Sequence, residues 1–220
     1  LVGLLACLIV CACLYEGYAH ETIRFLTTSN IRNILPLIGF FGILSLGQAL
    51  VIITGGIDLS VGSVVALAGI VTAILLRDVG WPPFVAIPIT LCMATVIGAW
   101  QGILVTKGRI QPFVVTLCGL FFYRGLARLI AKDITRGFGN GFPTLKWLGS
   151  GFIPNVDASF ISVPFVIMIA IAVIEGAYLH LTAPGRHIFA LGASEESARF
   201  SGIPVDRVKI TAYTLCGLLS

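Results

Sequence analysis

Charged residues are scarce in this chain of 220 residues, where they make up 11% of the sequence against 57% hydrophobic residues. An average globular domain carries about 25% charged residues. So few charges cannot cover the water-exposed surface of a soluble protein, which excludes an ordinary cytosolic enzyme and a disordered protein. The net charge of +4 comes without a dense basic run, which excludes a nucleic-acid binder. This balance suits a membrane protein whose loops contact anionic lipid.

Motifs for catalysis and for metal or nucleotide binding are also missing. The six cysteines lie in apolar runs without a C-x-x-C pair or a histidine at metal spacing, so we predict buried thiols. No G-x-x-x-x-G-K-[ST] loop is present to bind ATP phosphates, and residues 137–141 lack the spacing of a dinucleotide-binding loop. No nucleophile stands beside a base. The sequence therefore predicts no catalytic residues, no metal and no cofactor.

Long hydrophobic runs are abundant. A membrane-spanning helix needs about 20 mostly apolar residues. Five complete runs meet this requirement, and two partial runs lie at the ends of the chain. The complete runs are 34–53, 59–76, 84–106, 113–131 and 160–182, and the partial runs are 1–14 and 210–220. We therefore predict an all-α, polytopic transmembrane helix bundle that forms a single domain over residues 1–220, truncated at both ends.

Small residues recur every four positions in the run 84–106, at Ala94, Gly98 and Gly102. Residues at this spacing share one face of a helix. Small side chains on such a face allow two helix backbones to approach closely, which is how helices associate in lipid. The pattern predicts a tightly packed bundle.

A glycine pair separates the run 34–53 from the run 59–76. Gln48 lies late in the run 34–53. Gly55 and Gly56 then interrupt the helical hydrogen bonds of the backbone near membrane depth. Broken backbone of this kind is tolerated only where it is buried in protein or lines a cavity. Asp58 and Ser60 follow directly, and the pattern leaves two interpretations open. Their side chains cap the next helix, or they face a polar pathway for a substrate.

Arg124 is a further polar candidate within a span. Arg124 and Arg128 are four residues apart on one helix face and repel one another unless partnered. Arg128 can extend to the membrane surface, whereas Arg124 lies deeper and needs a carboxylate, a carbonyl or water. Glu175 lies well inside a span, but the sequence does not establish a contact between Glu175 and Arg124.

The long loop over residues 183–209 contains a helix signal. Ser194 is a good N-cap, Glu195 and Glu196 favour a helix N-terminus, and Gly202 fits a C-terminal stop. We predict a short helix over 195–201, which either lies on lipid or docks a soluble partner. Its acidic start and small apolar face favour docking. Alternating spans place six basic loop residues on each side of the membrane, so charge leaves the orientation open.

Four blocks of sequence carry a resemblance to a known family. They are residues 48–62 (QALVIITGGIDLSVG), residues 107–113 (KGRIQPF), residues 123–125 (YRG), and residues 185–192 (GRHIFALG) followed by 195–203 (EESARFSGI). In order and spacing these blocks resemble the membrane-spanning permease subunit of bacterial ABC-type monosaccharide importers, such as those for ribose. The resemblance runs from about residue 20 to the end of the chain.

The resemblance implies a multi-pass protein of the bacterial inner membrane with the 183–209 loop in the cytoplasm. It implies an ATPase subunit docked on that loop, a second permease subunit and a periplasmic sugar-binding protein. An ATPase contact is expected at six positions, and a substrate pathway at six others. The ATPase positions are Gly185, Arg186, Glu196, Ala198, Arg199 and Gly202, and the pathway positions are Gln48, Gly55, Gly56, Asp58, Ser60 and Arg124.

The alternative is an ion-coupled secondary transporter of a small polar solute. Such proteins place ion sites on broken helices near the middle of the membrane, which the Gly55–Gly56 break would fit. The scarcity of carboxylates inside the predicted spans argues against a proton relay in this chain.

Overall fold

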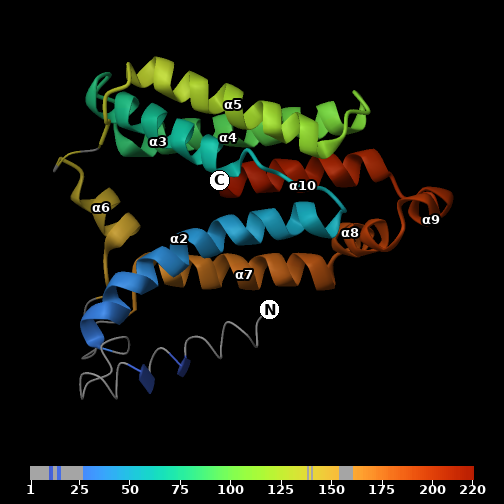
Figure 1. The fold of residues 1–220 in the computed structure, drawn as a ribbon, viewed down its shortest axis with the longest axis horizontal. Coiled ribbons are helices and arrows are strands. Elements are labelled where there is room, and N and C mark those ends of the chain that lie inside the picture. Colours follow the sequence, from blue (N-terminus) through green and yellow to red (C-terminus); the bar gives the residue numbers. More distant parts are fainter. Residues whose placement is uncertain (1–9, 12–13, 16–26, 138, 140, 154–160) are drawn as a thin grey trace. The chain divides into compact units, whose positions relative to one another are not determined.

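The computed structural model describes residues 10–11, 14–15, 27–137, 139, 141–153 and 161–220. Within these residues the regular secondary structure is helical, apart from one isolated antiparallel bridge between Phe152 and Ser162 (Figure 1). The partial run predicted over 1–14 falls mainly outside the described residues. The helices are α2 (Thr28–Ile53), α3 (Val61–Arg77), α4 (Pro83–Thr106), α5 (Pro112–Ala131), α6 (Pro143–Ser150), α7 (Val163–Leu181), α8 (Ala183–Ala193), α9 (Glu195–Phe200) and α10 (Val205–Leu219).

Membrane-length helices confirm most of the predicted spans. Among the described residues, α2, α4, α5 and α7 are long and apolar enough to cross a membrane. The predicted span 59–76 forms the shorter apolar helix α3, which has 17 residues. At about 1.5 Å per residue such a helix lies at the lower limit of spanning length. The predicted helical membrane bundle is therefore confirmed, with one short member.

Two compact units make up the chain. The first comprises residues 1–42 and 143–169, and the second comprises residues 43–142 and 170–220. In the first unit the early part of α2 packs directly on the start of α7, because a side chain at Gly39 would meet the backbone of Pro164 and Phe165. The Arg32 guanidinium also lies 4.8 Å from the Phe152 ring centre. The prediction of a single transmembrane domain stays a prediction.

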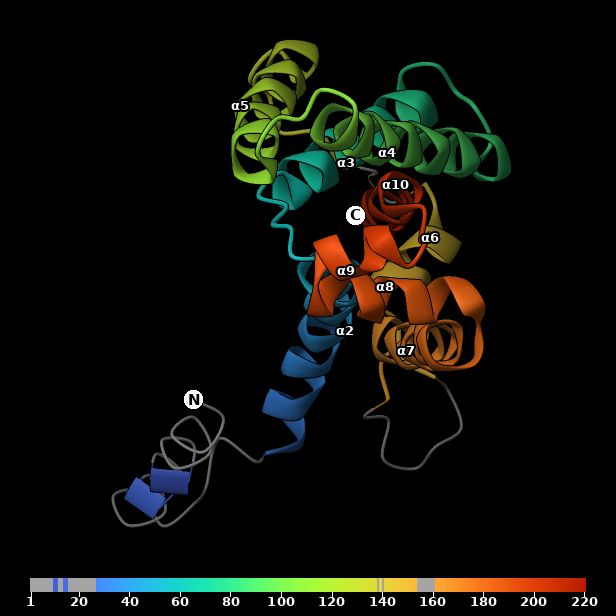
Figure 2. The same cartoon turned by 90° about the vertical axis from the view of Figure 1, so that its right-hand side faces the viewer.

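The second unit is organised around a close contact between α4 and α10, which Figure 2 shows side by side. A Cβ at Gly98 would strike the Tyr213 carbonyl, and a Cβ at Gly102 would lie 2.8 Å from the Ile210 Cα. On the other helix, a Cβ at Gly217 would lie 2.5 Å from the Ala94 carbonyl oxygen. The small-residue face of α4 therefore allows the backbone approach that its spacing predicted.

Three helical segments differ from the sequence prediction. α9 agrees with the predicted helix over 195–201, but residues 183–193 of the same predicted loop form α8. Thr182 caps α8, since its Oγ1 accepts a hydrogen bond from the Gly185 N–H at 3.2 Å. α10 begins at Val205 instead of residue 210, and α6 lies within the predicted loop 132–159. Thr182 followed by Pro184 is the helix-start signal that identifies α8.

The α4–α10 contact predicts unequal effects for two glycine substitutions. Gly98→Ala should destabilise the protein by about 1–3 kcal/mol, because the new methyl group overlaps the α10 backbone. Gly69→Ala on α3 meets open space and should change stability by at most about 1 kcal/mol, in the stabilising direction. Reversible unfolding of both variants in detergent measures the difference. Equal stability of the two variants would contradict the close approach.

Candidate functional site

The candidate site begins where α2 ends. The Gly55 N–H donates to the Ile52 carbonyl at 2.9 Å, and the Gly56 N–H donates to the Val51 carbonyl at 3.0 Å. This pair of hydrogen bonds is a Schellman motif, which requires a left-handed residue after the helix. Gly55 supplies it with φ +79°. The first glycine of the pair is therefore required by the backbone conformation.

The second glycine is required by a neighbour. A Cβ at Gly56 would lie 2.6 Å from the Tyr213 hydroxyl of α10 and 3.1 Å from the Val51 Cγ1. The Tyr213 side chain is itself almost completely buried. The backbone between α2 and α3 therefore lies directly against α10, and only glycine leaves room for it.

Asp58 and Ser60 form a local hydrogen-bonded turn before α3. The Asp58 Oδ1 accepts from the Ser60 N–H at 2.8 Å and from the Ser60 hydroxyl at 2.7 Å. The Gln48 amide donates to the Asp58 carbonyl at 3.1 Å. Asp58 is 5% exposed and Ser60 is fully buried. Ser60 is the N-cap residue of α3, but no side chain makes a capping hydrogen bond there, so these contacts stabilise the turn that precedes the helix. Substrate contact by these residues stays a prediction.

Three further helices supply side chains to the same break. The Gln101 amide of α4 donates to the Ser60 hydroxyl at 2.7 Å. The Thr116 hydroxyl of α5 donates to the Ile57 carbonyl at 3.3 Å, and the Tyr213 hydroxyl of α10 donates to the same oxygen at 3.5 Å. Sequence reasoning missed Gln101, Thr116 and Tyr213 as members of this site. An uncharged polar residue within an apolar span, as at Gln101, is the signal that would have found one of them.

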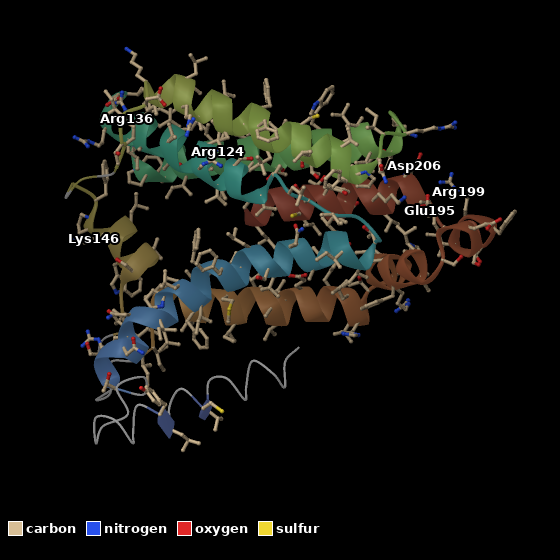
Figure 3. The ribbon with its side chains drawn as sticks, in the orientation of Figure 1. Arg124, Arg136, Lys146, Glu195, Arg199 and Asp206 are labelled. Carbon is tan, nitrogen blue, oxygen red and sulfur yellow. The ribbon has the colours of Figure 1, made fainter. Side chains whose placement is uncertain are left out.

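Arg124 lies apart from this cluster. Its side chain is exposed on α5 (Figure 3), and within the described part of the chain it forms no ion pair. Glu175 is 9% exposed on α7, and its Oε2 has no hydrogen-bond partner among the described residues. The carboxyl lines an apolar cavity of about 430 Å³ between α2, α7 and α10. The structure therefore brings together five of the six predicted pathway residues and leaves Arg124 outside.

The hairpin of α8 and α9 divides the predicted ATPase contacts into two groups. Arg186, Glu196, Arg199 and Gly202 are exposed. Gly185 and Ala198 are buried, and Ala198 packs in an apolar cluster with Leu50 and Ile188 among others. Ala198 therefore packs inside the hairpin, and Gly185 lies against the Tyr178 and Leu179 backbone at the end of α7. Direct contact with a partner is expected only from the exposed group.

The hairpin is also tied to the helices around the break. A Cβ at Gly192 of α8 would strike the Ile53 carbonyl, so α8 lies against the last turn of α2. The α9 carboxylate of Glu195 pairs with Lys209 of α10 at 2.7 Å and with Arg199 at 3.1 Å. Asp206 of α10 lies 3.1 Å from the Lys107 ammonium and 3.9 Å from the Arg199 guanidinium.

We call one group of five side chains the charged clasp: Lys107, Glu195, Arg199, Asp206 and Lys209. Figure 3 labels Glu195, Arg199 and Asp206 at one end of the unit. The clasp joins α9 to α10 and α10 to the end of α4. The hydrogen bond from Lys209 is the main cause that lowers the pKa of the Glu195 carboxyl below its ordinary value of 4.5.

Comparison with known proteins identifies the class of this helical membrane protein. The family described as "Branched-chain amino acid transport system / permease component" matches residues 30–220. The ribose import permease protein RbsC of Escherichia coli K12 is 37% identical over 199 residues, which cover 90% of this chain and 60% of that protein. The ribose import permease protein RbsC of Bacillus subtilis 168 is 38% identical, with 89% and 59% covered. The fructose import permease protein FruG of Bifidobacterium longum is 38% identical, with 81% and 54% covered.

The chain belongs to this family of transport-system permease components. Members of the family are permease subunits, which are not themselves catalytic. Together with its apolar helices, this membership places the chain in the inner membrane as a multi-pass protein. The chain spans about 60% of the length of the ribose permeases that it matches. No solved structure matches the chain.

The contact between Gly56 and Tyr213 predicts coupled substitutions. Gly56→Ala should destabilise the protein by about 1–3 kcal/mol, because its methyl group overlaps the tyrosine hydroxyl. Tyr213→Phe should cost about 0.5–1.5 kcal/mol, the value of one hydrogen bond. The double variant should be less destabilised than the sum of the two, because phenylalanine relieves the overlap. A double-mutant cycle of unfolding free energies measures this coupling, and strict additivity would contradict it.

The charged clasp predicts a pH dependence at α9. A carboxyl whose pKa is lowered on folding stabilises the folded hairpin above its ordinary pKa of 4.5. That contribution should decline as the pH falls below 4.5 and vanish below the lowered pKa of the folded state. Hydrogen exchange of residues 195–203, corrected for the intrinsic rate, should therefore accelerate in this range. In Glu195→Gln the exchange should already be fast at neutral pH, and an unchanged pH profile in that variant would refute the assignment.

Proposed function

We propose that the protein is the permease subunit of an ATP-binding-cassette importer that moves a monosaccharide, ribose or a related sugar, into the cell. The observation that carries the proposal is sequence identity of 37–38% with ribose import permeases over about 90% of this chain. Relatives include a fructose import permease, which favours a monosaccharide over a branched-chain amino acid. The sugar would cross without covalent change.

The partners of this importer are part of the proposal. An ATPase subunit would bind the exposed face of the α8–α9 hairpin from the cytoplasm and would hydrolyse ATP. A second permease subunit would complete the transmembrane pathway. A periplasmic sugar-binding protein would deliver the sugar to the opposite side of the membrane.

The contacts of the hairpin support a route from the ATPase to the helices. Glu195 and Arg199 join α9 to α10 through the charged clasp, and Gly192 places α8 against the end of α2. α10 in turn carries Tyr213 and Cys216 beside the Asp58 turn. ATP binding would bias two conformations of these helices, since transport requires states whose populations an energy source can shift.

Charge reversal at Glu196 tests the coupling. Glu196 is exposed on α9 and belongs to no ion pair among the described residues. Glu196→Arg in the full-length permease, co-expressed with its ATPase and binding protein, should lower ATP-dependent uptake of labelled ribose at least about tenfold, because reversal places like charges at the docking surface. Glu196→Gln should have a smaller effect. Glu196→Asp, which keeps the negative charge, should leave uptake nearly unchanged.

The same uptake assay separates the alternatives. Competition by unlabelled ribose, fructose and leucine tests the substrate class, and competition by leucine alone would overturn the sugar assignment. Uptake that survives ATP depletion but stops with an uncoupler would replace the ATP-driven importer with an ion-coupled secondary transporter. Unchanged uptake by Glu196→Arg would remove α9 from the docking surface.

A further inference from the structure

A charged cleft lies beside the hairpin, between the α4–α5 turn, α9 and the start of α10. It has a volume of about 540 Å³. Its apolar lining includes Val105, Ile110 and Pro112, and its charged lining includes the Glu195, Arg199, Asp206 and Lys209 side chains of the clasp. The turn from α4 to α5 adds Arg109. Apolar and charged side chains together line this cleft, and protein-binding surfaces combine the same two kinds of contact.

Arg109 is the cation of this cleft that the clasp does not neutralise. Lys107, Arg199 and Lys209 each lie within 4 Å of a carboxylate, whereas Arg109 forms no ion pair among the described residues. The cleft is lined by three cations and two carboxylates, and its excess positive charge is centred on the exposed Arg109 side chain. The cleft is complementary to an added negative charge.

The backbone at Arg109 is also unusual. Its φ is +52°, in the left-handed region that residues with a Cβ occupy at a cost of about 1–3 kcal/mol. A glycine would adopt this conformation without that cost, so the chain keeps a strained arginine at the mouth of a basic cleft. Among the described residues, no hydrogen bond or ion pair holds the Arg109 side chain, which leaves it available to a partner.

We propose that this cleft is a second docking surface for the ATPase subunit, in which Arg109 receives an acidic side chain of that subunit. The inference rests on the proposed function, because it assumes that the ATPase approaches the α8–α9 hairpin. The cleft opens beside that hairpin and shares Glu195 and Arg199 with it. A partner bound on the exposed face of α9 would therefore lie within reach of Arg109.

The composition of the cleft favours a polypeptide over an anionic lipid headgroup. Glu195 and Asp206 line the same space, and a phosphate group on Arg109 would bring no donors for these two carboxylates. A polypeptide can place a carboxylate on Arg109, its own amide donors toward these carboxylates, and an apolar side chain on Ile110 and Pro112. The ATPase contact would thus contain an acidic residue next to an apolar one.

Variants of the full-length permease, reconstituted with lipid and titrated with purified ATPase subunit, test the proposal. Arg109→Glu should weaken ATPase binding at least about tenfold, since it places an acid against an acid. Arg109→Lys should weaken binding less, because it keeps the charge and loses only the fork geometry. The control Lys146→Glu reverses an exposed charge on α6, outside the membrane-length helices, and should bind normally. The loss for Arg109→Glu should shrink at high salt.

A photo-crosslinking amino acid at position 109 identifies what fills the cleft. Crosslinking to the ATPase subunit in the assembled complex is the expected result. Normal ATPase binding by Arg109→Glu, or crosslinking to lipid in vesicles containing phosphatidylglycerol, would overturn the proposal. Glu196→Arg distinguishes the two levels of inference. If Glu196→Arg abolishes binding while Arg109→Glu does not, only the second surface is wrong. If neither variant affects binding, docking at this end of the protein is wrong.

Discussion

The backbone between α2 and α3 imposes the constraint on which the surrounding structure depends. A helix that breaks inside an apolar bundle exposes carbonyl and amide groups, and each group left without a partner would cost several kcal/mol there. Gln48, Thr116 and Tyr213 provide donors for the Asp58 and Ile57 carbonyls, and the Asp58 carboxylate accepts the Ser60 amide. Three helices besides α3 must therefore lie at fixed positions around one short turn.

The close packing of α4 and α10 follows from the same constraint. The Tyr213 hydroxyl reaches Ile57 only if α10 lies against the break, and Gln101 reaches Ser60 only if α4 does so too. Two helices that must both lie so near have little space between them. Gly98, Gly102 and Gly217 supply that space by removing side chains from the shared face. Small residues in this bundle thus serve the polar network as well as dispersion contacts.

Local signals predicted what local interactions determine. The glycine pair at 55–56 indicated the break, Ser194 and Gly202 indicated both ends of α9, and apolar runs indicated the spans. The partners of the break could not be predicted, because Gln101 and Tyr213 lie 41 and 156 residues from the groups that they bind. The charged clasp could not be predicted for the same reason, because Lys107 and Asp206 are 99 residues apart in the sequence. For Arg124 the position within a span could be predicted from the sequence, but the face of α5 on which it lies could not.

The break and the charged clasp differ in how strongly their contacts are held. The hydrogen bonds that join Ser60 to Asp58 and to Gln101 are buried, so water competes little for their donors and acceptors. The clasp is exposed, with side-chain exposures of 19–67%, and ion pairs of this kind contribute at most about 1 kcal/mol each. On the proposed function, the ion pairs of the clasp would adjust as α9 moves, while the hydrogen bonds of the break stay in place. The turn containing Asp58 would then move with α10 and α4 as one body when α9 shifts.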